Sequence, residues 1–139
     1  MKMDFRILIS GLLFLILGCA SARISINDKE IFMESPKIVV KEDRYFLKFR
    51  YAESPKFVFY AMTWSKIQGN KLIFYMPCTS SSGNLRGVVQ YEEIVSPDKI
   101  DLIKKQSVYW ENPENKLIKL VVGEMEESLD VIKSRIRTH

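Results

Sequence analysis

Few side chains in this sequence have the type and spacing that catalysis needs. Cys78 is a possible nucleophile, but a reactive thiolate needs a neighbouring base, and the single histidine, His139, is the last residue. Cys78 also shares strand parity with Leu72, Phe74 and Met76, so its thiol is expected to face the core with them. We therefore expect Cys78 to be a buried structural cysteine.

A polar segment follows Cys78. Serine catalysis would need a base and an oxyanion hole, and no G-x-S-x-G elbow occurs. We expect a solvated hairpin loop instead, and loops on a rigid sheet often carry binding. If this loop recognises a ligand, Arg86 is placed to pair with an anionic group. The residues of the predicted recognition loop are Ser80, Ser81, Ser82, Asn84 and Arg86.

Glu92 and Glu93 are the only adjacent carboxylates in a predicted strand that resemble an acid–base pair. Neighbouring strand residues point to opposite faces, so we expect two surface charges rather than a catalytic pair. One histidine and two cysteines exclude a zinc finger or a disulfide scaffold, and no calcium or phosphate-binding loop motif appears. The sequence therefore predicts no enzyme activity, no cofactor and no metal.

The first residues have the pattern of an export signal. Lys2 and Arg6 supply positive charge, and residues 7–17 are apolar. As a helix this stretch would rise roughly 16 Å at ~1.5 Å per residue, about half of a ~30 Å hydrocarbon core. A cleaved signal is therefore favoured over a permanent membrane span.

The end of that stretch, Ile16-Leu17-Gly18-Cys19, resembles the lipobox of bacterial lipoproteins. The resemblance implies a signal peptide over residues 1–18 and Cys19 as the lipid-attachment residue, carrying diacylglycerol and an amino-terminal acyl chain such as palmitate. Several acyl chains hold a protein on a bilayer, where one chain is marginal. In the same family Asp just after the cysteine marks inner-membrane retention. Its absence here implies the outer membrane, on the periplasmic face, if the source is Gram-negative.

A second cleavage site remains open. Ala20-Ser21-Ala22 has the A-x-A pattern of the ordinary signal peptidase, which would release a soluble secreted protein that begins at Arg23.

Length and composition favour one globular domain. The chain has 139 residues, of which 47% are hydrophobic, and its net charge of +4 is too mild to argue for nucleic acid. We expect a lipidated tether over residues 19–36 and a single β-rich domain over residues 37–139.

The chain after the tether is typical of β structure. Residues 44–51 alternate between apolar and basic side chains, with only Phe46 out of phase. We expect a hairpin between strands 57–64 and 71–76 around Gly69, and a second hairpin that pairs 71–76 with 87–95. Residues 108–110 and 116–122 should form a last strand pair.

Two helices are predicted. Ser96 and Pro97 start a short one that reaches residue 105. Residues 124–137 show apolar positions at helical spacing, acidic residues at the start and basic residues at the end, so we expect a C-terminal amphipathic helix. The fold class expected is therefore mainly β: a small antiparallel β-sandwich or barrel with a short C-terminal helix.

The sequence thus predicts a lipid-anchored protein of the bacterial envelope with a non-catalytic binding or structural domain. Its expected partners are the membrane and an envelope protein or cell-wall polymer, and not nucleic acid. Alternatives are the soluble secreted domain, a small enzyme acting on the cell wall, and a protein resembling the envelope lipoproteins that inhibit lysozyme.

Overall fold

The computed structural model describes residues 23–52, 63–77, 87, 89–132 and 136–137. Cys19, Cys78 and the predicted recognition loop (Ser80–Ser82, Asn84 and Arg86) lie outside these ranges. The expectations for those residues therefore stay predictions.

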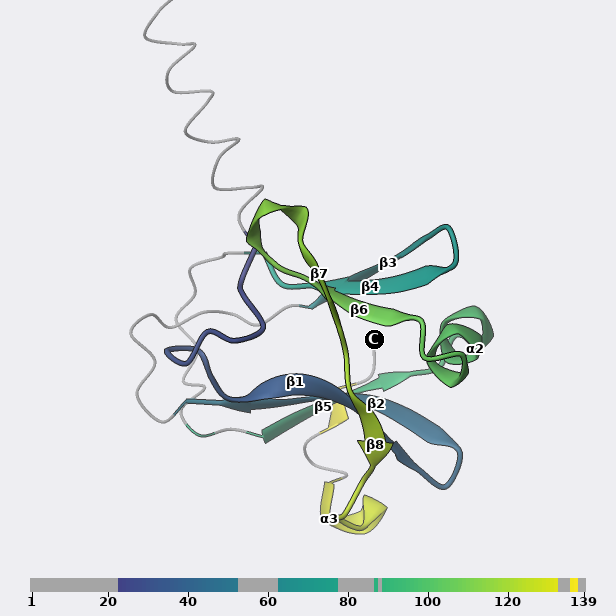
Figure 1. The fold of residues 1–139 in the computed structure, drawn as a ribbon. Helices are drawn as coiled ribbons and strands as arrows, with labels where there is room; N and C mark the ends of the chain where they lie inside the picture. The colour runs from purple at the N-terminus through teal and green to yellow at the C-terminus, as the bar shows by residue number, and fades with distance from the viewer. Residues whose placement is uncertain (1–22, 53–62, 78–86, 88, 133–135, 138–139) are drawn as a thin grey trace, which may run out of the picture.

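The described chain folds into two sheets that face each other (Figure 1). The five-stranded sheet has the order β8-β1-β2-β5-β9, and the four-stranded sheet the order β3-β4-β6-β7. The first sheet consists of β1 (Phe32–Lys41), β2 (Arg44–Tyr51), β5 (Val89–Ile94), β8 (Val122–Glu124) and β9 (Ile136–Arg137). The second consists of β3 (Trp64–Gln68), β4 (Lys71–Tyr75), β6 (Val108–Glu111) and β7 (Leu117–Lys119). The predicted mainly β, sandwich-like fold is confirmed, and neither sheet closes into a barrel.

Both sheets are mixed rather than purely antiparallel. β1 pairs with β8, β4 with β6 and β5 with β9 in parallel, whereas the other neighbours are antiparallel. Parallel neighbours need a crossover connection. Here these connections carry the chain from one sheet to the other, which a pattern of strands alone does not reveal.

Strand β2 shows how the sequence sets the two faces of the five-stranded sheet. Leu47, Phe49 and Tyr51 point inward and are buried in the main core. The core centres on Trp110, whose ring meets Phe49 at 6.2 Å between centroids in an edge-on contact. Such edge-to-face geometry is favourable for aromatic pairs, so the alternation in residues 44–51 correctly predicts both the strand and its buried face.

The first predicted hairpin is confirmed for the part of it that the structure describes. β3 and β4 pair antiparallel with Gln68 opposite Lys71, and Gly69 takes the turn at φ 62°. That left-handed conformation suits glycine, which has no Cβ to clash. Most of the predicted strand 57–64 lies outside the described residues.

The second predicted hairpin is wrong. β4 belongs to the four-stranded sheet, while β5 pairs with β2 and β9 in the other one. The inward-facing side chains of β4 and β5 meet across the core. Their alternating pattern therefore fits two strands of facing sheets as well as two strands of one hairpin.

A short helix and a 3-10 turn join the strands of the second half. α2 (Pro97–Lys104) begins at the predicted Ser96-Pro97 signal and lies at one end of the sandwich, between the sheets (Figure 1). η1 (Pro113–Asn115) connects β6 to β7. The predicted short helix is therefore confirmed.

Residues 23–36 belong to the folded unit and are not a tether. Ile24, Ile26 and Phe32 are buried in the main core. The indole Nε1 of Trp110 donates a hydrogen bond to the carbonyl oxygen of Ile24 at 2.9 Å. The expected domain start at residue 37 is thus too late, because alternating short apolar runs in 23–36 supply core side chains.

The C-terminal segment is mostly not the predicted helix over residues 124–137. α3 (Leu129–Ile132) has four residues, preceded by β8 and followed by β9. The amide of Met125 donates to the Val40 carbonyl oxygen at 2.9 Å, which holds the chain extended along β1. Sheet hydrogen bonds therefore override the helical spacing at the start of this segment.

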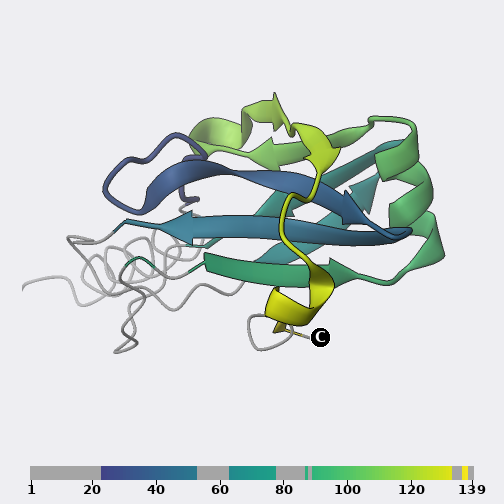
Figure 2. The same cartoon turned by 90° about the horizontal axis from the view of Figure 1, so that it is seen from below.

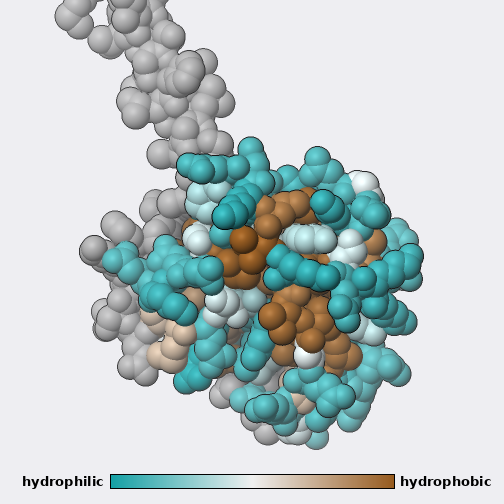
Figure 3. All heavy atoms as spheres, in the orientation of Figure 1, coloured by the Kyte–Doolittle hydropathy of each residue, from teal (hydrophilic) through white to brown (hydrophobic). Residues whose placement is uncertain are grey.

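This segment covers the outer face of the five-stranded sheet, as Figure 2 shows in yellow. Met125 and Leu129 pack there against Phe46, Val39 and Tyr91. The out-of-phase Phe46 of β2 is thus buried in a second, smaller core. Figure 3 shows further apolar side chains near β7 and β8, where Val121 is 68% exposed. Within the described residues, no helix has the length and apolar character to cross a membrane.

Candidate functional site

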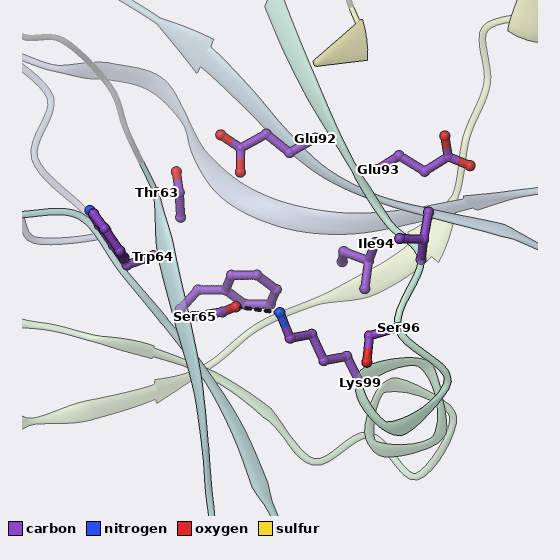
Figure 4. A pocket seen from close by; sticks show the side chains of 10 residues that line it. Thr63, Trp64, Ser65, Glu92, Glu93, Ile94, Ser96 and Lys99 are labelled. Carbon is purple, nitrogen blue, oxygen red and sulfur yellow. Dashed lines mark hydrogen bonds between the residues drawn. The ribbon is translucent and has the colours of Figure 1, made fainter. Parts of the chain in front are cut away.

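A pocket opens between β3 and β5 at the end of the sandwich where α2 begins (Figure 4). Its volume is about 390 Å³. Its floor is apolar, and the walls carry hydroxyl groups and two opposite charges. The apolar residues are Trp64, Phe74, Ile94 and Val95, and the polar ones are Thr63, Ser65, Ser96, Glu92, Glu93 and Lys99.

Lys99 is placed by the start of α2. Pro97 fixes the first turn of the helix, and Lys99 follows within that turn, so its side chain reaches across the opening toward β3. Its Nζ donates a hydrogen bond to Ser65 Oγ at 2.8 Å, drawn as the dashed line in Figure 4. This contact links α2, which follows β5 of the five-stranded sheet, to β3 at the edge of the four-stranded sheet.

Glu92 lies at the other end of the pocket from Lys99 (Figure 4). It pairs in register with Leu47 and shares parity with Ile94, so it faces the space between the sheets and is only 7% exposed. The expectation that Glu92 is a surface charge is therefore wrong. Its inward direction follows from its place on β5, whose inner face is covered by the second sheet.

The Thr63 hydroxyl lies in the same half of the pocket as Glu92. It is buried and has no hydrogen-bond partner among the described residues. A buried hydroxyl without a partner costs free energy unless water or a ligand satisfies it.

Glu93 points out of the pocket and away from Glu92 (Figure 4). Its two carboxylate oxygens accept hydrogen bonds from Nε and NH2 of Arg44 at 2.7 and 2.8 Å. This pair lowers the pKa of the Glu93 carboxyl, against the smaller opposing effect of burial, and raises the pKa of Arg44. The prediction that the two glutamates face opposite sides is confirmed.

The arrangement suits binding of a small polar molecule. A cation and a carboxylate stand at opposite ends of an apolar floor, with hydroxyl groups on the walls. Pockets that bind small molecules combine these features, an apolar lining with a few placed polar groups. Among the described residues, no group of histidine, cysteine, aspartate and glutamate is close enough to hold a metal ion.

The residues that build this pocket were not among the predicted site residues. Thr63 and Ser65 lie at the start of β3 and Lys99 lies in α2, and no short motif connects the two elements. Glu92 alone carried a usable signal, because its parity with Ile94 places it on the inner face of a strand.

Comparison with known proteins gives no match: no family model, no curated protein and no solved structure matches this chain significantly.

Proposed function

We propose that this chain is a lipid-anchored protein of the bacterial envelope whose β-sandwich binds a small polar ligand without transforming it. The observation that carries the binding role is the pocket between β3 and β5. There Lys99, Glu92 and the Thr63 hydroxyl, which has no hydrogen-bond partner in the described part of the chain, surround an apolar floor.

The anchor is supported by the lipobox-like segment that ends at Cys19 and by where the fold begins. Arg23 already forms a β-bridge with Pro77, so only residues 20–22 separate the lipid-attachment residue from the sandwich. A lipidated Cys19 would hold the domain close to the membrane surface.

The ligand class follows from the size and charges of the pocket. A volume of about 390 Å³ is near the lower end for ligand pockets and suits one sugar or amino-acid unit. Lys99 favours an anionic group at one end, and Glu92 favours an amine or hydroxyl donor at the other. One terminal unit of a cell-wall peptide or glycan has this chemistry.

Metabolic labelling with a clickable fatty acid tests the anchor. The full-length chain should incorporate the label, and the Cys19→Ser variant should not. Equal labelling of the two would rule out Cys19 as the attachment residue.

Calorimetric titration with muropeptides released by a muramidase tests the pocket. Lys99→Met should weaken binding at least tenfold, because the anionic group loses its charged partner. Lys104→Met is the matched control, since Lys104 is an exposed lysine of the same helix. No binding to the wild type, or equal loss in both variants, would contradict this ligand assignment.

The Ser65–Lys99 contact favours one second candidate, a small hydrolase acting on the cell wall. A lysine within hydrogen-bond reach of a serine is one known way to activate a nucleophilic hydroxyl. A fluorophosphonate probe separates the two proposals. Binding without catalysis predicts no labelling of the folded protein, whereas labelling that disappears in Ser65→Ala would establish the hydrolase.

A further inference from the structure

The outer face of the four-stranded sheet carries several cations beside aromatic rings. Strand parity places its side chains on the side away from the core, because Ser65, Phe74 and Trp110 of the same strands face inward. The cations on this face are Arg23, Lys66, Lys71 and Lys119, and the aromatic residues are Trp64, Tyr75 and Tyr109. We call these seven residues the basic aromatic face.

Three of the four cations lie against the rings. The guanidinium of Arg23 lies 4.3 Å and the amine of Lys66 5.4 Å from the centre of the Tyr75 ring. The amine of Lys71 lies 5.4 Å from the centre of the Tyr109 ring. Such contacts fix the charged groups near the surface while leaving them hydrated.

Only one carboxylate, Glu111, joins this face among the described residues of the sheet. It is 5% exposed and accepts hydrogen bonds from Arg23 and Lys66. Four cations against one buried carboxylate leave the face strongly positive. Trp64 is 51% exposed and opposite Tyr75 in register, so a large apolar ring stands beside these charges.

The chain reaches the predicted anchor from this same face. The described N-terminus, purple in Figure 1, lies beside the four-stranded sheet, and Arg23 is both its first residue and a member of the face. Residues 20–22 span at most about 11 Å when extended. A lipid on Cys19 would thus hold Arg23, and with it this end of the face, near the lipid headgroups, at a distance comparable to a Debye length of about 8–10 Å.

We propose that the basic aromatic face docks on the surface of an anionic phospholipid bilayer. Lysine and arginine near such a surface are attracted to it, and tryptophan and tyrosine favour the headgroup region, where one end of the ring is apolar and the other wet. The docking deepens the proposed function: it rests on the anchor at Cys19 and sets which face of the sandwich meets the membrane. The β3–β5 pocket then opens at the side of the docked domain.

Vesicle binding of the chain without its lipid tests the face separately from the anchor. Residues 20–139 contain every described residue, and circular dichroism checks that each variant is folded. The wild type should bind vesicles of phosphatidylcholine with about 30% phosphatidylglycerol at least tenfold more tightly than pure phosphatidylcholine, with binding that weakens as salt rises.

The variants identify the face. Lys71→Gln with Lys119→Gln should weaken binding to the anionic vesicles at least tenfold, at about fivefold per charge. Lys37→Gln with Lys104→Gln removes the same charge from β1 and α2 and should change binding less than twofold. Headgroup-region quenchers should reduce the emission of the wild type but not of Trp64→Phe, because Trp110 is fully buried.

Equal binding to both kinds of vesicle, or equal loss in both double variants, would overturn the docking proposal and leave the anchor unaffected. Equal fatty-acid labelling of the full-length chain and Cys19→Ser, or no labelling of either, would remove the anchor and leave the vesicle result to stand on its own.

Discussion

The Nε of Arg23 donates a hydrogen bond to Oε2 of Glu111 at 3.2 Å and joins the first described residue to the end of β6. Lys66 Nζ reaches Oε1 of the same carboxylate at 3.2 Å. Glu111 is thus buried between two cations that come from different parts of the chain. The start of the fold, beside the predicted anchor, is held to the sheet by this cluster.

Glu111→Gln should reduce the free energy of unfolding by about 1–3 kcal/mol at neutral pH, because the buried charged hydrogen bonds become neutral ones. The control should leave the pocket unchanged, so a variant of Lys99 is not suitable. Glu114→Gln changes an exposed glutamate in η1 and should alter stability by less than about 0.5 kcal/mol. Urea unfolding measures the free-energy change of both variants. Equal changes would contradict a stabilising role for the Arg23–Glu111–Lys66 cluster.

The same carboxylate predicts a pH dependence. Burial alone raises the pKa of Glu111, but hydrogen bonds from Arg23 and Lys66 outweigh it, and the net pKa lies below the ordinary 4.5. A group with a lowered folded pKa stabilises the fold above its unfolded pKa, and this stability is lost as pH falls through the folded value. The stability difference between wild type and Glu111→Gln should therefore be full above about pH 4.5 and shrink in more acidic solution. Urea unfolding over this pH range measures it, and a constant difference would show that the carboxylate does not titrate as described.

Trp110→Phe should reduce the free energy of unfolding by about 2–3 kcal/mol. The variant removes the hydrogen bond to the Ile24 carbonyl oxygen and leaves a gap beside Phe32, whose ring meets Trp110 edge-on at 6.1 Å. Chemical unfolding followed by circular dichroism gives the change. A cost below about 0.5 kcal/mol would mean that the N-terminal residues are not packed on the core.

Met125→Ala should cost about 2–4 kcal/mol, because Met125 is 5% exposed in the second core. Met33→Ala is the matched control: Met33 is 40% exposed, and its truncation should cost less than about 0.5 kcal/mol. Urea unfolding of the two variants compares them directly. Equal costs would show that the C-terminal segment does not cover the sheet.

Arg44 and Glu93 should show a coupling energy of about 0.5–1 kcal/mol in a double-mutant cycle of Arg44→Gln and Glu93→Gln. The two parallel hydrogen bonds strengthen the coupling. The Arg44 side chain is 39% exposed, however, so solvent screens the interaction. The coupling should fall as salt rises. A coupling that salt leaves unchanged would argue against an ion pair at the surface.

Local patterns in the sequence were sufficient to predict β2, α2 and the β3–β4 hairpin. In each case one strong signal decides the structure: alternation in residues 44–51, Ser96-Pro97 at a helix start, and Gly69 in a turn. These signals act within a few residues and do not depend on which sheet a strand joins.

Pairing between distant segments was beyond these patterns. β5 joins β2 rather than β4, and Gly123 pairs with Val39 of β1 in parallel. Met125 and Leu129 do bury, as their spacing indicates, but the sheet hydrogen bond at Met125 keeps the chain extended there. The pocket depends on the same long-range arrangement, because Thr63 and Ser65, at the start of β3, face β5 and α2 only once the two sheets are packed.

The intact mass and amino-terminal sequence of the chain isolated from membranes test the central claim, attachment through Cys19, most directly. The proposal predicts a chain that starts at Cys19 and carries the mass of a diacylglycerol with an additional acyl group. An unmodified chain that starts at Arg23 would contradict it.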